Sequence, residues 1–124
     1  MKFLGTGSAL PKKVVSNDDL AQVMDTSDEW IRSRTGIGMR HIAVEETTTS
    51  MAVEAAEKAL ADAKISGCEI DLIIAGTISP DYIFPSLACE VQAAIGAKSA
   101  TAFDLSAGCS GFLFALATAD AYFR

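Results

Sequence analysis

The sequence has little cysteine, a single histidine and no cluster of basic residues. Among its 124 residues there are 3 cysteines and 1 histidine. Cys68, Cys89 and Cys109 include no Cys-x-x-Cys pair, and their odd number argues against a disulfide framework. Because zinc sites use about four Cys or His ligands in close-spaced pairs, the sequence also argues against a metal site. We therefore expect a protein of a reducing compartment, the cytoplasm, that holds no metal.

The charge balance is acidic. The chain has 10 Lys and Arg residues against 16 Asp and Glu residues, which gives a net charge of −6. A nucleic-acid surface needs a basic stripe that displaces counterions, so we expect no nucleic-acid partner. The longest apolar stretch without a charge, Leu105 to Ala119, is interrupted by serine and glycine. It is shorter than the about 20 residues that span a bilayer, so we expect no membrane segment.

The middle of the sequence predicts alternating helices and strands. Half of the residues are hydrophobic, enough for a buried core in one domain. Apolar residues at helical spacing between Ala52 and Ala63 predict an amphipathic helix. The unalternating apolar run Ile70 to Thr77 predicts a parallel strand covered on both faces. A second helix at Ser86 to Ile95 and a second strand at Thr101 to Leu105 repeat the pattern, so we predict an α/β fold with right-handed crossovers.

The first third of the chain gives weaker signals. Phe3 to Leu10 predicts a short strand that runs into a turn at Pro11. The run Ser16 to Asp19 predicts the start of a helix that ends near Met24. A second short helix is predicted from Thr26 to about Ser33, and an extended segment from Met39 to Val44.

The segment Cys109 to Ala119 carries no charge on any side. A helix that is apolar all round is buried all round, whereas a helix outside a single sheet shows one polar face. We therefore expect this helix to lie between two sheets, one of which residues 1–124 do not supply. The alternative is a carboxy-terminal helix that is apolar without being covered.

Cys109 is the candidate nucleophile. It follows the predicted strand Thr101 to Leu105 and precedes the apolar helix, within Gly108-Cys109-Ser110-Gly111. Ligands of α/β folds bind at such strand ends, and N–H groups at a helix start favour a thiolate and an acyl oxyanion. The alternative is a buried, inert thiol. We interpret Cys68 and Cys89 as structural.

Trp30 is the only tryptophan, and Arg32, Arg34 and Thr26 lie near it in the sequence. An aromatic plane beside guanidinium groups suits a nucleotide, through base stacking and phosphate hydrogen bonds. Composition alone nevertheless favours Trp30 as a core anchor. His41 is interpreted as a structural histidine, although histidine is the most frequent general base.

Six motifs in series resemble one family. They are Gly5-Thr6-Gly7-Ser8-Ala9-Leu10-Pro11, Thr26-Ser27-Asp28-Glu29-Trp30-Ile31, Arg34-Thr35-Gly36-Ile37, Arg40-His41-Ile42-Ala43, Phe84-Pro85-Ser86 and Ala107-Gly108-Cys109-Ser110-Gly111-Phe112. Together they resemble the amino-terminal part of 3-oxoacyl-(acyl carrier protein) synthase III, an acyltransferase that starts fatty acid synthesis. The resemblance covers essentially the whole sequence.

The resemblance implies the amino-terminal half of a thiolase-like α/β fold, with a mixed, mainly parallel sheet and a buried central helix. It implies that Cys109 is acetylated by acetyl-CoA and then condenses with malonyl-acyl carrier protein, with no separate cofactor. Thr26, Trp30 and Arg34 match positions that bind coenzyme A, which reverses the interpretation of Trp30 as a core anchor. Phe84 matches a residue that reaches the partner's acyl pocket in a homodimer.

The sequence departs from the family by ending at Arg124. We expect residues 1–124 to be an amino-terminal half-domain whose carboxy-terminal half is absent, together with the catalytic histidine and asparagine that the resemblance places there. His41 does not replace that histidine, because it lies in a different family motif. Two alternatives remain: a non-catalytic acyl-CoA-binding or assembly module of the same fold, and another thiolase-type enzyme, which the motifs at Thr26 and Arg34 disfavour.

Overall fold

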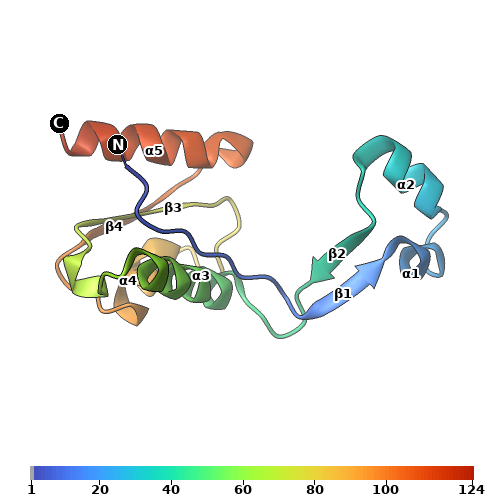
Figure 1. Cartoon of the computed structure of the whole chain (residues 1–124), viewed down its shortest axis with the longest axis horizontal. Coiled ribbons are helices and arrows are strands. Elements are labelled where there is room, and N and C mark those ends of the chain that lie inside the picture. The colour runs from blue at the N-terminus through green and yellow to red at the C-terminus, as the bar shows by residue number, and fades with distance from the viewer. Residues whose placement is uncertain (1) are drawn as a thin grey trace. The chain divides into compact units, whose positions relative to one another are not determined.

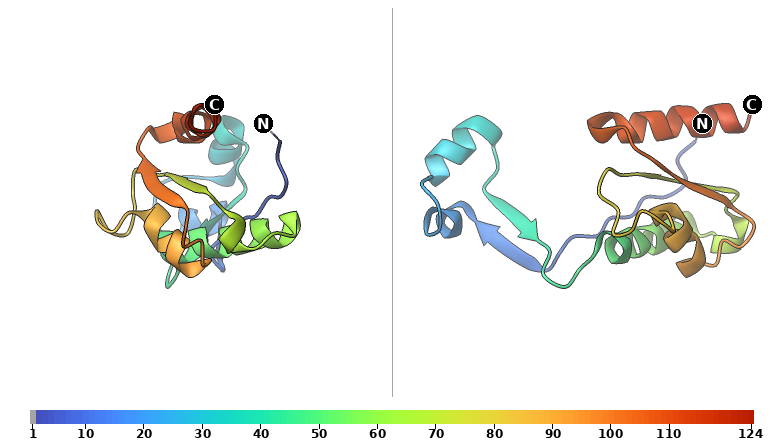
Figure 2. Two further views of the ribbon diagram at one scale, coloured as in Figure 1. Left: turned by 90° about the vertical axis from the view of Figure 1, so that its left-hand side faces the viewer. Right: turned by 180° about the vertical axis from the view of Figure 1, so that it is seen from behind.

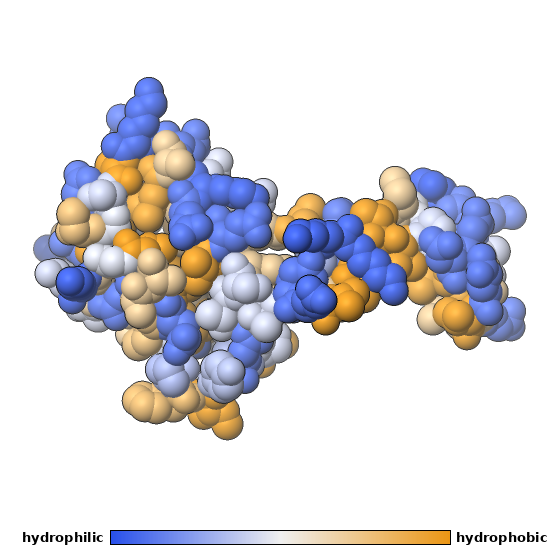
Figure 3. Space-filling view, turned by 90° about the horizontal axis from the view of Figure 1, so that it is seen from below, coloured by the Kyte–Doolittle hydropathy of each residue, from blue (hydrophilic) through white to orange (hydrophobic). Residues whose placement is uncertain are grey.

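The computed structural model describes residues 2–124, which form two compact units. Unit 1 consists of Met1–Ala9 and Thr47–Arg124, and unit 2 is Leu10–Glu46. Hydrophobic side chains reach the surface in both units (Figure 3). Each unit is described by itself below.

Unit 1 is built in three layers around a parallel strand pair. Its elements are α3 (Thr48–Ala63), β3 (Leu72–Gly76), α4 (Leu87–Ala94), β4 (Thr101–Leu105) and α5 (Gly111–Tyr122). Strands β3 and β4 pair in parallel from Leu72 opposite Thr101 to Gly76 opposite Leu105. Helices α3 and α4 lie on one face of this pair and α5 lies on the other (Figures 1 and 2). The predicted α/β order and the parallel pairing are confirmed.

The core of unit 1 lies under α4. Its most buried apolar residues are Leu87, Ala88, Val91, Ala97 and Ala100. Ser86 begins the helix, because its hydroxyl accepts a hydrogen bond from the Cys89 N–H at 3.3 Å. The small side chain of Ala88, which is fully buried, lets α4 pack closely on the strands.

The segment from Phe3 to Leu10 forms no strand, so that prediction is wrong. The segment instead lies against α3, where the Thr6 N–H donates to the Asp62 carboxylate at 2.9 Å. A side chain at Gly7 would place its Cβ 2.0 Å from the Ala55 carbonyl oxygen. Gly5 and Gly7 therefore allow the backbone to lie close against α3, and they do not form a turn after a strand.

Unit 2 contains a two-stranded ribbon and two short helices. Strand β1 (Lys13–Ser16) pairs antiparallel with β2 (Met39–Ile42), and α1 (Asn17–Ala21) and α2 (Asp28–Thr35) lie between them in the sequence. Helix α1 ends before the predicted Met24, because the N–H groups of Val23 and Met24 both donate to the Leu20 carbonyl and close the helix in a turn.

Helix α5 is the apolar helix that the sequence predicts, but residues 2–124 do not cover it on all sides. It packs on β3, while Phe112, Leu113 and Phe114 are 66%, 67% and 55% exposed. The strand pair lies on one face of α5 only (Figure 2). This agrees with the expectation that residues 1–124 supply only one of the two sheets around this helix.

Residues 1–124 produced alone are expected to self-associate or to bind a hydrophobic dye. Leaving a large apolar side chain in water costs about 1.5–3 kcal/mol. Domain stability is only about 5–15 kcal/mol, so three such side chains on α5 offset much of it. Sedimentation at micromolar concentration and dye binding measure the effect. The double variant Phe112→Lys, Leu113→Lys is expected to suppress both self-association and dye binding. A wild-type monomer that binds no dye contradicts the expectation.

Candidate functional site

The candidate site residues fall into two groups, one in each unit. Cys109 and Phe84 lie in unit 1, and Thr26, Trp30 and Arg34 lie in unit 2. Of these residues, the structure brings Trp30 and Arg34 into direct contact.

Cys109 lies in an exposed turn immediately before α5. The turn is a short 3-10 helix, Gly108–Ser110, closed by the Ser110 N–H donating to the Ala107 carbonyl at 3.1 Å. Gly108 has a φ of +50°, a left-handed conformation that favours glycine. The Cys109 thiol is free and exposed, so within residues 2–124 it is not a buried thiol.

The start of α5 is held close to the end of β3. Gly111 is buried, and a Cβ at Gly76 would lie 3.3 Å from the Gly111 carbonyl carbon. The Ser110 side chain makes no capping hydrogen bond to the residues that the structure describes. The first N–H groups of α5 therefore offer a partial positive charge beside Cys109, which stabilises negative charge on a thiolate or an acyl oxyanion.

Phe84 lies in the segment between β3 and α4. Its side chain is 89% exposed, and its peptide bond to Pro85 is cis. The neighbouring Ile83 and Tyr82 are 98% and 62% exposed. An aromatic side chain this exposed makes little contribution to the core of unit 1 and is available to another surface.

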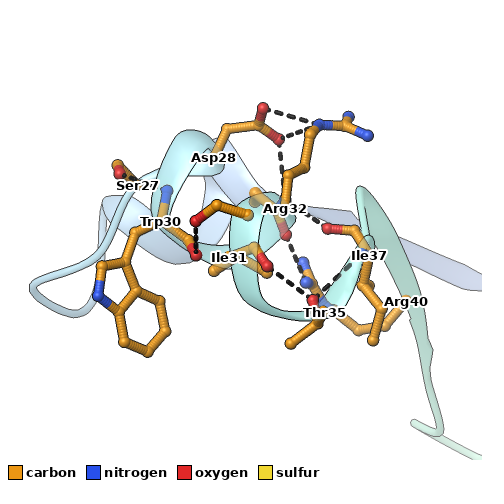
Figure 4. Close-up of polar contacts among 10 residues, drawn as sticks. Ser27, Asp28, Trp30, Ile31, Arg32, Thr35, Ile37 and Arg40 are labelled. Atoms are coloured by element: carbon orange, nitrogen blue, oxygen red, sulfur yellow. Dashed lines mark hydrogen bonds and ion pairs between the residues drawn. The ribbon is translucent and has the colours of Figure 1, made fainter.

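Trp30 and Arg34 form an exposed pair on one side of α2. The Arg34 guanidinium carbon lies 4.5 Å from the centre of the Trp30 ring, the geometry of a cation–π contact. The Trp30 side chain is 53% exposed and points away from the polar contacts of α2 (Figure 4). The interpretation of Trp30 as a core anchor is therefore wrong, since unit 2 does not bury the indole.

Local hydrogen bonds fix the two ends of α2 and so place Trp30 in its first turn. Ser27 begins the helix, because its hydroxyl accepts from the Trp30 N–H at 3.1 Å. Thr26 is half-buried and directly precedes this cap. At the other end, Gly36 adopts a φ of +72° and its N–H donates to the Arg32 carbonyl. Trp30 thus sits in the first turn of a helix with two defined ends.

Asn17 holds unit 2 together, whereas its place in the sequence predicts only the start of a helix. It is fully buried. Its amide nitrogen donates to Asp28 and to the Ile37 carbonyl, both at 2.8 Å, and its amide oxygen accepts from Arg40. The hydrogen bond from Asn17, followed by that from Arg32, lowers the pKa of Asp28.

The remaining candidates have structural contacts. The His41 Nδ1 donates to the Pro11 carbonyl within unit 2, which supports its interpretation as structural. The Cys89 thiol is half-buried and donates to the Ala102 carbonyl at 3.8 Å, whereas Cys68 is exposed beside Ser66.

Among residues 2–124, no three His, Cys, Asp or Glu side chains gather where they could hold a metal ion. No helix in this range combines the length and apolarity needed to cross a membrane.

Comparison of sequences identifies related proteins. The chain is 58% identical to beta-ketoacyl-[acyl-carrier-protein] synthase III of Bordetella petrii, over 97% of this chain and 38% of that protein. It is 62% identical to the Streptococcus suis protein of the same name, over 90% of this chain and 34% of that protein. The chain thus spans well under half the length of these curated relatives. No protein-family model matches it.

Comparison of structures agrees with the sequences. The crystal structure of 3-oxoacyl-[acyl-carrier-protein] synthase III from Aquifex aeolicus has a TM-score of 0.95 at 55% identity, over 98% of this chain and 40% of that one. The Thermus thermophilus synthase III has a TM-score of 0.90 at 42% identity, over 98% of this chain and 38% of that one. The chain therefore has the amino-terminal part of a thiolase-type fold.

Replacing Asn17 with alanine is expected to destabilise unit 2 by about 2–3 kcal/mol, because it leaves buried polar partners without hydrogen bonds. Thermal and urea unfolding followed by circular dichroism measure the loss. Asp18→Ala is the matched control, since Asp18 is the exposed next residue of α1. Equal unfolding midpoints for the two variants would show that Asn17 is not the central support of unit 2.

Proposed function

We propose that this chain, which is homologous to the amino-terminal part of beta-ketoacyl-[acyl-carrier-protein] synthase III, supplies the acylated nucleophile of a condensing enzyme in fatty acid synthesis. The observation that carries the proposal is the exposed Cys109 thiol at the uncapped start of α5. The family resemblance of the six motifs, sustained by identities above 50%, supports the same assignment.

In the first half of the reaction, the Cys109 sulfur attacks the thioester carbonyl of acetyl-CoA. The carbonyl oxygen takes the negative charge in the tetrahedral intermediate, and the Cys109 N–H together with N–H groups at the start of α5 stabilises this charge. The bond from the carbonyl carbon to the coenzyme A sulfur then breaks. Coenzyme A leaves as a thiol after taking the proton that Cys109 loses, and the acetyl group remains on Cys109.

The Trp30 and Arg34 pair is the proposed coenzyme A contact. The exposed indole offers a stacking surface for the adenine ring, and the Arg34 guanidinium supplies charge for the phosphates. Thr26 lies at the start of the same helix and would contact the adenine. In the structure Arg34 covers the indole, so binding would use the free face of the ring or move Arg34 toward the phosphates.

In the second half, malonyl-acyl carrier protein loses carbon dioxide, and the resulting carbanion attacks the acetyl carbonyl on Cys109. The bond from the carbonyl carbon to the Cys109 sulfur then breaks, the product leaves on the carrier protein, and the Cys109 thiolate takes a proton from water to become a thiol again. The family resemblance assigns a histidine and an asparagine outside residues 1–124 to this step. Residues 1–124 alone would therefore acylate Cys109 at most, without turnover.

The active protein would be a homodimer in which Phe84 reaches the partner's acyl pocket. The chemistry needs no cofactor besides the coenzyme A thioester.

Acetyl-CoA is expected to add one acetyl group to the protein made from the complete reading frame that contains this chain. Intact-mass measurement detects the adduct, and peptide mapping places it. Cys109→Ser is expected to abolish the adduct, whereas Cys68→Ser and Cys89→Ser are expected to retain it. An adduct on Cys68 or Cys89 overturns the assignment of the nucleophile. A protein that binds acyl-CoA but never forms an adduct is the non-catalytic module.

Trp30→Ala is expected to weaken coenzyme A binding by roughly 5- to 150-fold, because stacking of a base on an aromatic ring is worth about 1–3 kcal/mol. The melting temperature should change little, since the indole is exposed. Isothermal titration calorimetry measures the affinity. Val23→Ala, at a side chain that is 77% exposed in the same unit, is the control. Unchanged affinity for Trp30→Ala excludes the stacking role.

A further inference from the structure

Helix α2 carries the proposed nucleotide contact, yet none of its own residues is buried. Packing therefore does little to fix its direction within unit 2. Most of its hydrogen bonds are internal or reach the residues directly beside it, such as the Ser27 cap and the Gly36 N–H. Among residues 2–124, one side-chain hydrogen bond joins α2 to another element, from the Asn17 amide to the Asp28 carboxylate at 2.8 Å.

Asn17 is a rigid point of attachment. Its side chain is fully buried, its amide nitrogen also donates to the Ile37 carbonyl at 2.8 Å, and its amide oxygen accepts from Arg40 of β2. Arg40 donates in addition to the Val15 carbonyl of β1 at 3.2 Å. The Asn17 amide is thus fixed with respect to both strands of the ribbon, and it fixes the start of α2 with respect to them.

The attached side of α2 differs from the side that carries the indole. Residues two apart in an α-helix are separated by about 200° around its axis. Asp28 pairs with the Arg32 Nε at 2.8 Å on one side, and Figure 4 shows this pair away from the indole. Arg34 lies over Trp30 on the other side. A Cβ at Gly38 would lie 2.5 Å from an Arg32 nitrogen, so the guanidinium also rests against the residue before β2.

We propose that Asn17 and Asp28 are positioning residues for acyl transfer, because their hydrogen bond sets the direction in which the Trp30 side of α2 faces. The inference rests on the proposed function, in which one acetyl-CoA molecule is held by its nucleotide at Trp30 and reacts by its thioester at Cys109. Neither Asn17 nor Asp28 contacts coenzyme A. They act through the direction of α2.

The consequence is a separation between binding and acyl transfer. Thr26, Trp30 and Arg34 belong to α2 or to the residues directly before it, so a nucleotide keeps its contacts when the helix turns as a body. The thioester end of the bound molecule is then displaced from the sulfur. A displacement of about 1 Å can lower a rate by about 100-fold. Loss of the hydrogen bond therefore slows acylation of Cys109 without weakening nucleotide binding.

The test compares Asp28→Asn with the wild type in the protein made from the complete reading frame that contains this chain. Asparagine keeps one acceptor oxygen but turns an NH₂ group toward the donors of Asn17 and Arg32. The rate of Cys109 acylation at saturating acetyl-CoA is expected to fall by about 10- to 100-fold. The affinity for adenosine 3′,5′-bisphosphate, followed through Trp30 emission, is expected to stay within about twofold.

Two controls isolate the effect. S-Acetyl-N-acetylcysteamine carries the thioester without the nucleotide, so its rate of Cys109 acylation is expected to be the same in Asp28→Asn and in the wild type. Glu29→Gln is the matched variant, because it removes the same charge from the first turn of α2 at an exposed side chain that makes no hydrogen bond to residues 2–124. Its acylation rate and its nucleotide affinity are expected to match the wild type.

A merely structural role lowers the nucleotide affinity and the acylation rate together, and that result overturns the proposal. An unchanged acylation rate overturns it as well, and so does an equal fall with S-acetyl-N-acetylcysteamine. If Asp28→Asn does not fold, Asp28→Ala takes its place, because alanine removes the carboxylate without turning an NH₂ group toward Asn17. Failure of both variants to fold assigns the hydrogen bond to folding alone and also overturns the proposal. A wild-type protein that is not acylated at Cys109 instead refutes the proposed function, so the two failures are distinguishable.

Discussion

The backbone contact between Gly76 and Gly111 sets the place of the candidate nucleophile. The two glycines lie at the end of β3 and the start of α5, and a Cβ on either would lie less than 4 Å from the other's backbone. Because no side chain separates them, the helix begins directly on the strand end, and the turn that carries Cys109 projects at the edge of the sheet. The left-handed Gly108 allows the chain to make this turn in three residues. The chemistry proposed for the thiol depends on this close approach, since the N–H groups of α5 act only over a short range.

Unit 2 is held together by a buried polar residue and not by an apolar core. It has few buried side chains, and its most buried one is an asparagine rather than an apolar residue. Asn17 links the strands to the loop before β2 and to the first turn of α2 through hydrogen bonds. In this small unit, directional bonds fix the helix that carries Trp30, while the indole stays exposed.

The regular elements of unit 1 could be predicted from the sequence, and the polar residues that orient the site could not. The strand Thr101–Leu105 has the bounds that the repeated helix–strand pattern predicts. The wrong strand at Phe3–Leu10 has the same apolar character, but its glycines pack on α3, a contact with residues about 50 positions away that local patterns do not contain. Asp104 is a single charge inside an apolar strand, and its carboxylate accepts hydrogen bonds from the N–H groups of Leu87 and Ala88 at the start of α4. By contrast, nothing in the helix-start pattern around Asn17 distinguishes it from an ordinary capping residue.

The exposure of Trp30 has a practical consequence. It is the only tryptophan in the chain, and it lies on the surface in contact with a guanidinium group. Indole emission from this protein therefore comes from one defined position, at the surface where we propose that a nucleotide stacks. A change in its intensity or wavelength reports displacement of Arg34 or shielding of the ring from water, without a label. The protein thus carries an intrinsic optical probe of α2.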